Sequence, residues 1–168
     1  MICPDCGHDN IPGMDSCEEC GTDLRSLDVP QPGQGLQKTL LEEPLRALSP
    51  RRPLKVSPGD TLDKAVRLMK ENNEGSVFVM EEERLVGILT ERDLLLKVAG
   101  KPIALDRTPV RNMMTREPVV LRSDDALAYA LNRMSVGRYR HIPIVDGGRL
   151  TGFVSVRGIL GFIAEKLA

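Results

Sequence analysis

Hydrophobic positions over residues 62–69 follow the period of a helix. They recur at i, i+3, i+4 and i+7, the spacing of one amphipathic face, and are Leu62, Ala65, Val66 and Met69. Asp60 lies just before this face and is the expected N-cap. A second, closing helix is expected over residues 91–99, ending at Gly100.

The segments between these helices have the pattern of strands. Residues 76–80 (SVFVM) and 85–89 (LVGIL) are short apolar runs separated by charged residues, which predicts two strands joined by a turn. Residues 54–57 form a short extended segment before the first helix. The order predicted for this part of the chain is therefore β-α-β-β-α.

The whole pattern occurs twice, at a constant offset of 65 (152 − 87 = 65), as Gly87 and Gly152 show. The second helical face is Leu127, Ala130, Leu131 and Met134, preceded by Asp124 and Asp125 as expected caps. Strands at 141–145 and 150–154 and a helix at 156–167 complete the second copy. One unit exposes an apolar sheet face, and two units can pack these faces together. The prediction is an α/β (α+β) fold of two β-α-β-β-α units related by a pseudo-twofold axis, with residues 45–105 as the first and 106–168 as the second.

Composition narrows this picture. The chain has 168 residues, 41% of them hydrophobic, and with no Trp, two Tyr and three Phe its core must be aliphatic. No apolar run reaches the roughly 18 residues of a membrane span. The start of the chain also lacks the basic and apolar segments of a secretory signal. We therefore expect a soluble cytoplasmic protein without membrane contact.

The first 20 residues hold all four cysteines, Cys3, Cys6, Cys17 and Cys20. They form two C-x-x-C pairs, each followed by a glycine, which is the spacing of a closed tetrahedral thiolate site. Structural Zn²⁺ is the expected occupant of a small four-cysteine zinc ribbon over residues 1–24, and iron is the alternative. Disulfides are disfavoured in a chain without an export signal. His8 is expected to be a bystander.

Charge is divided unevenly along the chain. The net charge is −1, but residues 1–24 carry six carboxylates and no Lys or Arg, which leaves 23 basic and 18 (24 − 6) acidic residues elsewhere, about +5. Phosphate backbones are bound by cationic side chains, so the ribbon is expected to contact an unidentified protein partner rather than nucleic acid. Residues 25–44, rich in Pro, Gly and Gln, are predicted to be a flexible linker.

Two phrases, LVGILTERDL (85–94) and RYRHIPIVDGGRLTGFVS (138–155), strongly resemble a tandem pair of CBS domains, also called a Bateman module. The resemblance covers about three quarters of the chain. It implies a regulatory sensor that binds an adenosine-containing ligand (AMP, ADP, ATP or S-adenosylmethionine, with the adenine nucleotides favoured) and forms a homodimer. It also implies that the module is not itself an enzyme.

Asp93 has two interpretations. Thr90-x-x-Asp93 has the spacing of a helix capping box, whereas the resemblance implies that Thr90 and Asp93 hold a ribose. The second copy has Ser155 and Gly158 at these positions, so the fold does not require the carboxylate. The resemblance implies a ligand site built across the pseudo-twofold axis, and its expected residues are Thr90, Arg92, Asp93, Met114, Thr115, Arg116, Pro118, Val119, Tyr139, Arg140 and His141, with Arg138 as a further candidate. The symmetry-related second site is expected to be degenerate, and its residues are Arg51, Arg52, Ser155, Arg157 and Gly158.

Other function classes have less support. The sequence shows neither a nucleophile–base constellation nor a phosphate-binding glycine loop, which argues against an enzyme. The main alternative is a dimeric scaffold or adaptor that acts through its zinc ribbon without a nucleotide. Nucleic-acid contact, if it exists, is expected on the basic body and would be sensitive to salt.

Overall fold

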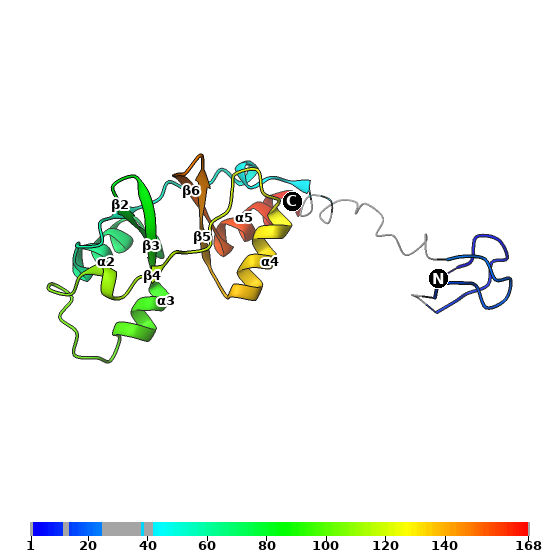
Figure 1. The fold of residues 1–168 in the computed structure, drawn as a ribbon, viewed down its shortest axis with the longest axis horizontal. Coiled ribbons are helices and arrows are strands. Elements are labelled where there is room, and N and C mark those ends of the chain that lie inside the picture. Colours follow the sequence, from blue (N-terminus) through cyan, green and yellow to red (C-terminus); the bar gives the residue numbers. More distant parts are fainter. Residues whose placement is uncertain (1, 12–13, 25–37, 39–41, 168) are drawn as a thin grey trace. The chain divides into compact units, whose positions relative to one another are not determined.

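The computed structural model describes residues 2–11, 14–24, 38 and 42–167, and it divides the chain into the units Met1–Lys38 and Thr39–Ala168. The predicted linker falls largely outside the described residues. In the first unit, shown in blue in Figure 1, the chain folds into two similar knuckles. The Cys3 carbonyl accepts from the Gly7 amide at 3.0 Å, and 14 residues later (17 − 3) the Cys17 carbonyl accepts from the Gly21 amide at 2.9 Å. Both glycines have positive φ, 72° and 75°, which explains the residue type at these turns.

The first half of the second unit is an α/β layer. Its elements in chain order are β1 (Lys55–Val56), α2 (Leu62–Glu71), β2 (Ser76–Glu81), β3 (Arg84–Thr90), α3 (Glu91–Asp93) and the π-helical segment η2 (Leu94–Val98). Strand β1 runs parallel to β2, and β2 pairs with β3 as an antiparallel hairpin. The α3–η2 turns form the predicted closing helix, which ends before Gly100 at φ 73°.

The second half repeats this arrangement. Its elements are η3 (Val110–Asn112), β4 (Thr115–Arg116), α4 (Leu127–Gly137), β5 (His141–Asp146), β6 (Arg149–Ser155) and α5 (Val156–Leu167). Strands β5 and β6 form an antiparallel hairpin. Leu121 makes a parallel bridge to Ile144, as Val56 does to Val79 in the first half. The predicted repeat of a mixed α+β unit is thus confirmed.

The two halves exchange their leading segments. Strand β4 joins the first sheet, where Arg116 pairs with Gly87, and Arg51 makes the reciprocal bridge to Phe153 of β6. In the same way, η1 (Leu45–Leu48) packs in the core of the second half, and η3 packs in the core of the first. The packing units therefore differ from the sequence repeats, because the segment that leads into each repeat crosses to the other one.

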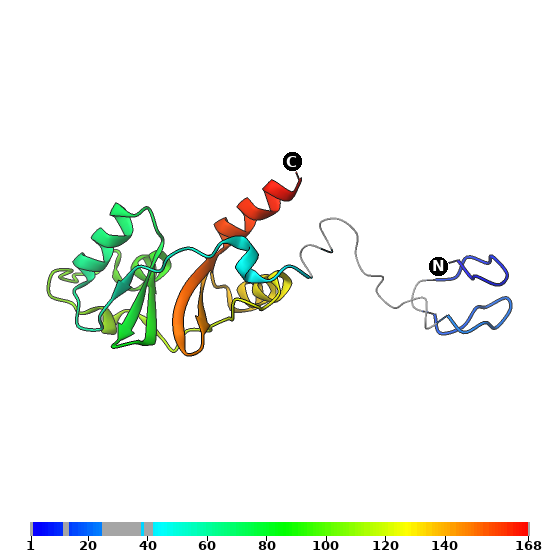
Figure 2. The same cartoon turned by 90° about the horizontal axis from the view of Figure 1, so that it is seen from above.

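Aliphatic side chains fill both cores, and the two hairpins meet through an aromatic pair. The hairpins, green and orange, are neighbours in both Figure 1 and Figure 2. Between them lies a buried cluster of Phe78, Met80, Ile88, Leu150 and Phe153, in which the two phenylalanine rings are 5.1 Å apart between centroids. Burying such a side chain contributes about 1.5–3 kcal/mol, so this cluster is a main attachment between the halves.

The predicted aspartate caps are wrong. Thr61 caps α2, and Asp60 instead accepts from the Ser57 amide at 2.8 Å. Helix α4 begins after Ala126 without a side-chain cap, and Asp125 accepts from the Arg122 amide at 2.8 Å. Both aspartates close the turn before the helix, because a short carboxylate reaches amides in its own turn as readily as those of the helix. Asp124 forms an ion pair with Arg46.

None of the helices that the structure describes combines the length and apolar character needed to cross a membrane.

Candidate functional site

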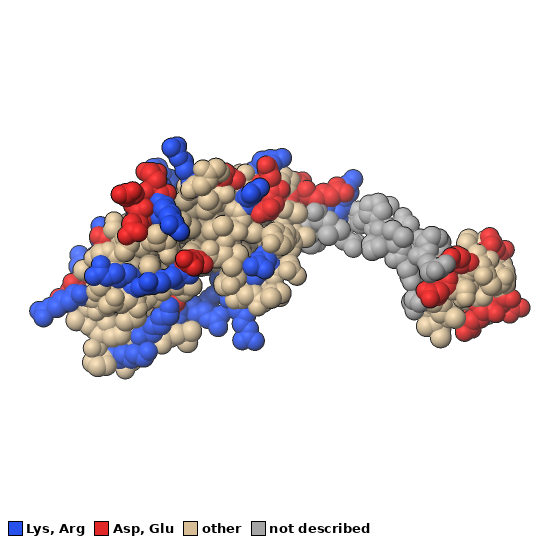
Figure 3. Space-filling view, in the orientation of Figure 1, with Lys and Arg blue, Asp and Glu red and all other residues tan. Residues whose placement is uncertain are grey.

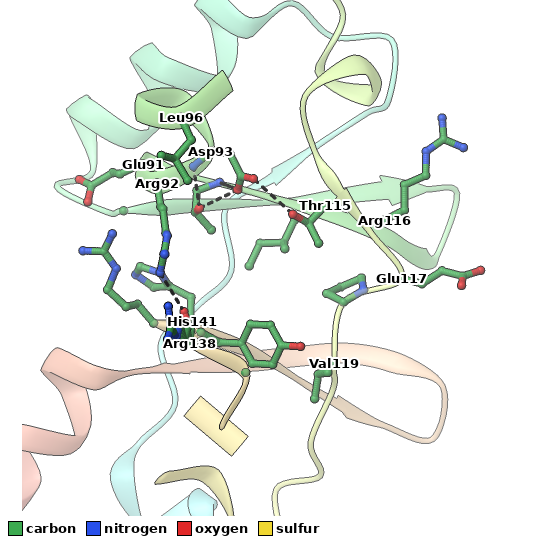
Figure 4. Close-up of a pocket in the computed structure, with 17 residues that line it drawn as sticks. Glu91, Arg92, Asp93, Leu96, Thr115, Arg116, Glu117, Val119, Arg138 and His141 are labelled. Carbon is green, nitrogen blue, oxygen red and sulfur yellow. Dashed lines mark hydrogen bonds between the residues drawn. The ribbon is translucent and has the colours of Figure 1, made fainter. Parts of the chain in front are cut away.

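A cavity of about 510 Å³ opens between the two halves of the second unit. One wall is the end of β3 with the first turn of α3, and the opposite wall is the segment 137–141 that leads into β5. The exchanged segment 115–119 closes the side between them (Figure 4). The crossing of the leading segments therefore brings both repeats to this one cavity.

Asp93 lies at the β3–α3 wall, almost fully buried at 9% exposure. Its Oδ2 accepts from the Thr90 amide at 3.0 Å and from Thr90 Oγ1 at 2.6 Å, while Thr90 Oγ1 accepts from the Asp93 amide at 3.3 Å. The capping box expected from the spacing is thus present. The other carboxylate oxygen of Asp93, Oδ1, accepts a hydrogen bond from Thr115 Oγ1 of β4 at 3.3 Å and forms an ion pair with Lys97 Nζ at 2.6 Å. The carboxylate therefore links the helix cap to the exchanged segment.

The pKa of Asp93 reflects two opposed influences. Burial is the largest and acts to raise the pKa, but the hydrogen bond and positive charge of Lys97 and the hydrogen bonds from Thr90 outweigh it. The pKa lies below its ordinary value of 3.8, so Asp93 is anionic at neutral pH. It places a fixed negative charge at the cavity wall.

Cationic side chains gather at the opposite wall. Arg138 and Arg140 line the cavity there, and Arg92 crosses from α3, where its Nη1 donates to the Arg138 carbonyl at 3.3 Å (Figure 4). Tyr139 also lines this wall, and its ring lies over Gly137, where an added Cβ would come within 2.1 Å of the ring. Any larger residue at this glycine would displace the tyrosine. This wall suits an anionic group, whereas Asp93 suits hydrogen-bond donors.

His141 stands at the start of β5 with its Nδ1 buried and without a hydrogen-bond partner in the described structure. Burial lowers its pKa below 6.5, Glu91 opposes this effect, and Arg140 and Arg51 add to it. The ring is therefore neutral at pH 7. A ligand in the cavity can supply the missing partner, since the residue is part of the lining.

The structure brings ten of the eleven predicted ligand residues to the cavity lining, and Arg138 with them. Met114 is the exception, because its side chain lies over Gly87 and packs against the first core. Arg116 and Glu117 are exposed, and in Figure 4 their side chains extend away from Asp93 and His141.

Further lining residues were not predicted. They are Gly75, Ile88, Glu91, Leu96, Glu117 and Gly137. Glu91, Glu117 and Gly137 adjoin a predicted residue in sequence, so for these three neighbourhood was an available signal. Leu96 had none, because its approach to the cavity depends on the π-helical winding of η2.

At the degenerate position the residues make other contacts. Ser155 Oγ accepts from the Gly158 amide at 3.1 Å, so the cap is kept without a carboxylate. Arg51 forms an ion pair with Glu74 at 2.7 Å. In the register of the repeats, Arg51 corresponds to Arg116 (116 − 65 = 51) and Glu74 corresponds to Tyr139 (139 − 65 = 74). Arg116 and Tyr139 both line the cavity, so at the degenerate position a salt bridge joins the two equivalent residues. Arg52 and Arg157 are exposed.

The first unit gathers the four cysteines. Their sulfur atoms all lie within 4.8 Å of one another, with Cys3 to Cys20 and Cys6 to Cys17 each at 3.6 Å. Tetrahedral Zn–S bonds of about 2.3 Å place sulfurs about 3.8 Å apart, close to this spacing. Disulfide sulfurs lie at about 2.05 Å, so the described cysteines are free thiols. The donor set fits a closed metal site.

Hydrogen bonds favour the thiolate at Cys17 and Cys20. At Cys6 the backbone hydrogen bond with His8 acts to lower the pKa, but the neighbouring sulfurs and burial outweigh it and raise the pKa to about 12. The backbone amides of Cys20 and Glu19, followed by the Asn10 amide at 3.5 Å, lower the pKa of Cys17 to about 6. The Thr22 hydroxyl, 3.1 Å from Cys20 Sγ, lowers the pKa of that thiol. His8 is not in the sulfur cluster and contributes its carbonyl, which accepts from the Cys3 amide at 2.9 Å. Around this cluster, the charged side chains within residues 2–24 that are coloured in Figure 3 are all acidic.

Comparison with known proteins gives consistent results. A profile of the CBS domain matches residues 45–100 and 110–165. The CBS domain-containing protein CBSCBSPB5 of Arabidopsis thaliana is 33% identical over 116 residues, which cover 68% of this chain but only 21% of that protein, so the chain spans about a fifth of this relative. The crystal structure of the CBS domain NE2398 has a TM-score of 0.69 at 26% identity and covers 73% of this chain and 98% of its own. The CBS domain protein PAE2072 from Pyrobaculum aerophilum, solved in complex with AMP, has a TM-score of 0.64 at 24% identity, covering 73% and 99%.

Proposed function

Because this chain belongs to the CBS-domain family, as a tandem pair, we propose that it is a regulatory module that binds an adenine nucleotide in the cavity between its repeats. The observation that carries the proposal is the opposition of an anionic Asp93 on one wall to Arg138, Arg140 and His141 on the other. Ribose hydroxyls suit the carboxylate as donors, and phosphate oxygens suit the cations as acceptors. S-adenosylmethionine, which carries a positive charge, suits this cationic wall less well. The AMP complex of a protein with the same fold supports the same ligand class.

Calorimetric titration of the zinc-loaded protein with AMP, ADP, ATP and S-adenosylmethionine tests this proposal. We expect about one nucleotide per chain. Asp93→Asn should weaken binding by about tenfold to a hundredfold, because hydrogen bonds to a charged acceptor contribute about 1.5–3 kcal/mol. Asp60→Asn is the matched control, since Asp60 also accepts a backbone amide but lies outside the cavity lining. Failure of all four ligands to bind would leave the scaffold or adaptor function as the better explanation.

We also propose that residues 1–24 bind structural zinc and form a ribbon that contacts another protein. The tetrahedral spacing of the four sulfurs and the closed donor set support zinc, and the acidic surface supports a protein partner rather than nucleic acid. Elemental analysis of the purified protein should give one zinc per chain. One iron per chain, with the visible absorption of an iron–thiolate centre, would contradict the assignment.

Association into a homodimer is part of the proposal. Several large apolar side chains are exposed on helical elements of the second unit, namely Leu95, Leu96, Val136 and Leu160. A patch of exposed apolar side chains is typical of association, and these residues are the candidates for such a patch. Light scattering coupled to size-exclusion chromatography measures the mass directly, and a monomer at all concentrations would remove this part of the proposal.

A further inference from the structure

The Asp93 carboxylate has no acceptor site to spare. A carboxylate offers about four lone-pair directions. Oδ2 uses two of them, for the amide and hydroxyl of Thr90 at 3.0 and 2.6 Å. Oδ1 uses the others, for Lys97 Nζ at 2.6 Å and Thr115 Oγ1 at 3.3 Å. A ribose hydroxyl can therefore bond to Asp93 only if one of these partners leaves.

Lys97 is the partner best able to leave. The Thr90 bonds belong to the capping box, and Thr115 is held by the pairing of β4 with Ile88 of β3. The lysine stem is flexible, its side chain is 39% exposed, and its ammonium also donates to the Met113 carbonyl at 2.7 Å. With three donors on Nζ, Lys97 can give up Asp93 and keep the carbonyl and water as partners.

The second repeat supports a link between these two residues. At the position equivalent to Asp93 it has Gly158, and at the position equivalent to Lys97 (97 + 65 = 162) it has Phe162. Helix α5 begins normally without either residue, with Ser155 as its cap. The fold thus requires neither the carboxylate nor the lysine, and both occur in the helical segment α3–η2, which forms one wall of the cavity.

We propose that Lys97 is a specificity-determining residue, whose ammonium competes with the ribose hydroxyls for Asp93 Oδ1, so that binding of a nucleoside exchanges one for the other. This inference rests on the nucleotide-binding function proposed above. The exchange breaks the link that Lys97 makes between Asp93 and the Met113 carbonyl, which lies between η3 and β4 in the leading segment of the second repeat. A ligand without ribose hydroxyls occupies the cavity and leaves Lys97 in place.

The test compares AMP with 2′,3′-dideoxy-AMP by calorimetry, using the wild-type protein, Lys97→Met and Lys97→Arg. The measured quantity is the ratio of the two dissociation constants, dideoxy-AMP over AMP. Both ligands carry the same phosphate, so any effect of the lost charge on phosphate binding cancels in this ratio. We expect Lys97→Met to raise the ratio on the order of tenfold, because the hydroxyls no longer displace an ion-paired ammonium. Lys97→Arg should return it toward the wild-type value.

A second readout follows the lysine itself. In the ¹⁵N spectrum of lysine ammonium groups, the Lys97 signal is identified by its absence from the spectrum of Lys97→Met. In the wild-type protein this signal should shift when AMP is added and stay in place with dideoxy-AMP. A ratio that is unchanged or lower in Lys97→Met overturns the inference, and if the wild-type protein still binds AMP, the proposed function stands without it. If neither protein binds AMP, ADP or ATP, the proposed function is overturned, and the inference with it.

Discussion

Substitution Gly158→Asp rebuilds in the second repeat the carboxylate that the first repeat has at Asp93. The local geometry is ready for it, because Ser155 Oγ already accepts from the Gly158 amide at 3.1 Å, as Thr90 Oγ1 does from the Asp93 amide at 3.3 Å. A Cβ added at Gly158 meets only Ser155 Oγ, at 3.4 Å, which is ordinary van der Waals contact. The new side chain therefore enters without displacing the helix.

Its effect on the free energy of unfolding is the sum of small terms. Replacing a helical glycine stabilises by about 0.5–1 kcal/mol when alanine takes its place, and by only a few tenths of a kcal/mol for aspartate, which is a poorer helix former. A carboxylate in the first helical turn adds about 0.3–1 kcal/mol through the free amides and the helix dipole. We expect Gly158→Asp to stabilise the protein by about 1 kcal/mol. Gly158→Ala is the control, since it changes the helix propensity and adds no carboxylate.

Urea denaturation of the zinc-loaded protein, followed by circular dichroism, measures these differences as shifts of the midpoint at unchanged slope. Aspartate is a poorer helix former than alanine by up to about 0.7 kcal/mol, so stability equal to or above that of Gly158→Ala shows that the carboxylate contributes. This contribution should vanish below about pH 4, where the carboxylate is protonated. If Gly158→Asp is less stable than the wild-type protein, the proposed equivalence of the two helix starts is refuted.

Three other changes have defined outcomes. The lowered pKa of Asp93 contributes stability that is present above the unfolded value of 3.8 and is lost as the pH falls through the lower folded value. Asp93→Asn should therefore flatten the acid limb of a plot of the denaturation midpoint against pH. An unchanged acid limb would contradict this. Chelation of the metal should unfold residues 2–24, because structural zinc contributes on the order of 10 kcal/mol. The NMR signals of residues 45–167 should stay in place. Signals from residues 2–24 that remain dispersed would count against a metal-dependent fold. Phe153→Ala should destabilise the protein by about 3–5 kcal/mol, because it leaves a cavity between the hairpins. Urea denaturation measures this loss, with substitution of the exposed Tyr129 by alanine as the control. A loss below about 1 kcal/mol would mean that the hairpins repack without this ring.

Periodicity alone was enough to predict most of the secondary structure. The helical faces that include Leu62 and Leu127 are buried as expected, and the strands lie within one or two residues of their predicted limits. These features depend on local spacing, which the sequence shows directly. The helix starts were predicted less well, because Asp60 and Asp125 have two sets of amides within reach and only the folded turn decides between them.

The candidate site was predictable where its residues come from one repeat or from the crossing segment. Thr90 and Asp93 follow from the comparison of the two copies, and the family resemblance supplied the contribution of residues 115–119. The side chain of Met114 could not be placed in this way, because its direction depends on the close approach to Gly87, where an added Cβ would lie 2.5 Å from the sulfur. The role of Lys97 also depends on geometry, since only the folded chain brings its ammonium to both Asp93 and the Met113 carbonyl.

The two repeats serve as internal controls for one another. Both form the same elements, so a position at which they differ without changing the fold reports on something other than folding. Three such differences, Asp93 with Gly158, Lys97 with Phe162 and Tyr139 with Glu74, concern residues in or next to the cavity. At the degenerate position, the Arg51–Glu74 ion pair of the first repeat joins the residues equivalent to Arg116 and Tyr139. The proposed function therefore implies one nucleotide per chain, and a sigmoidal binding curve would then require coupling between chains rather than within one.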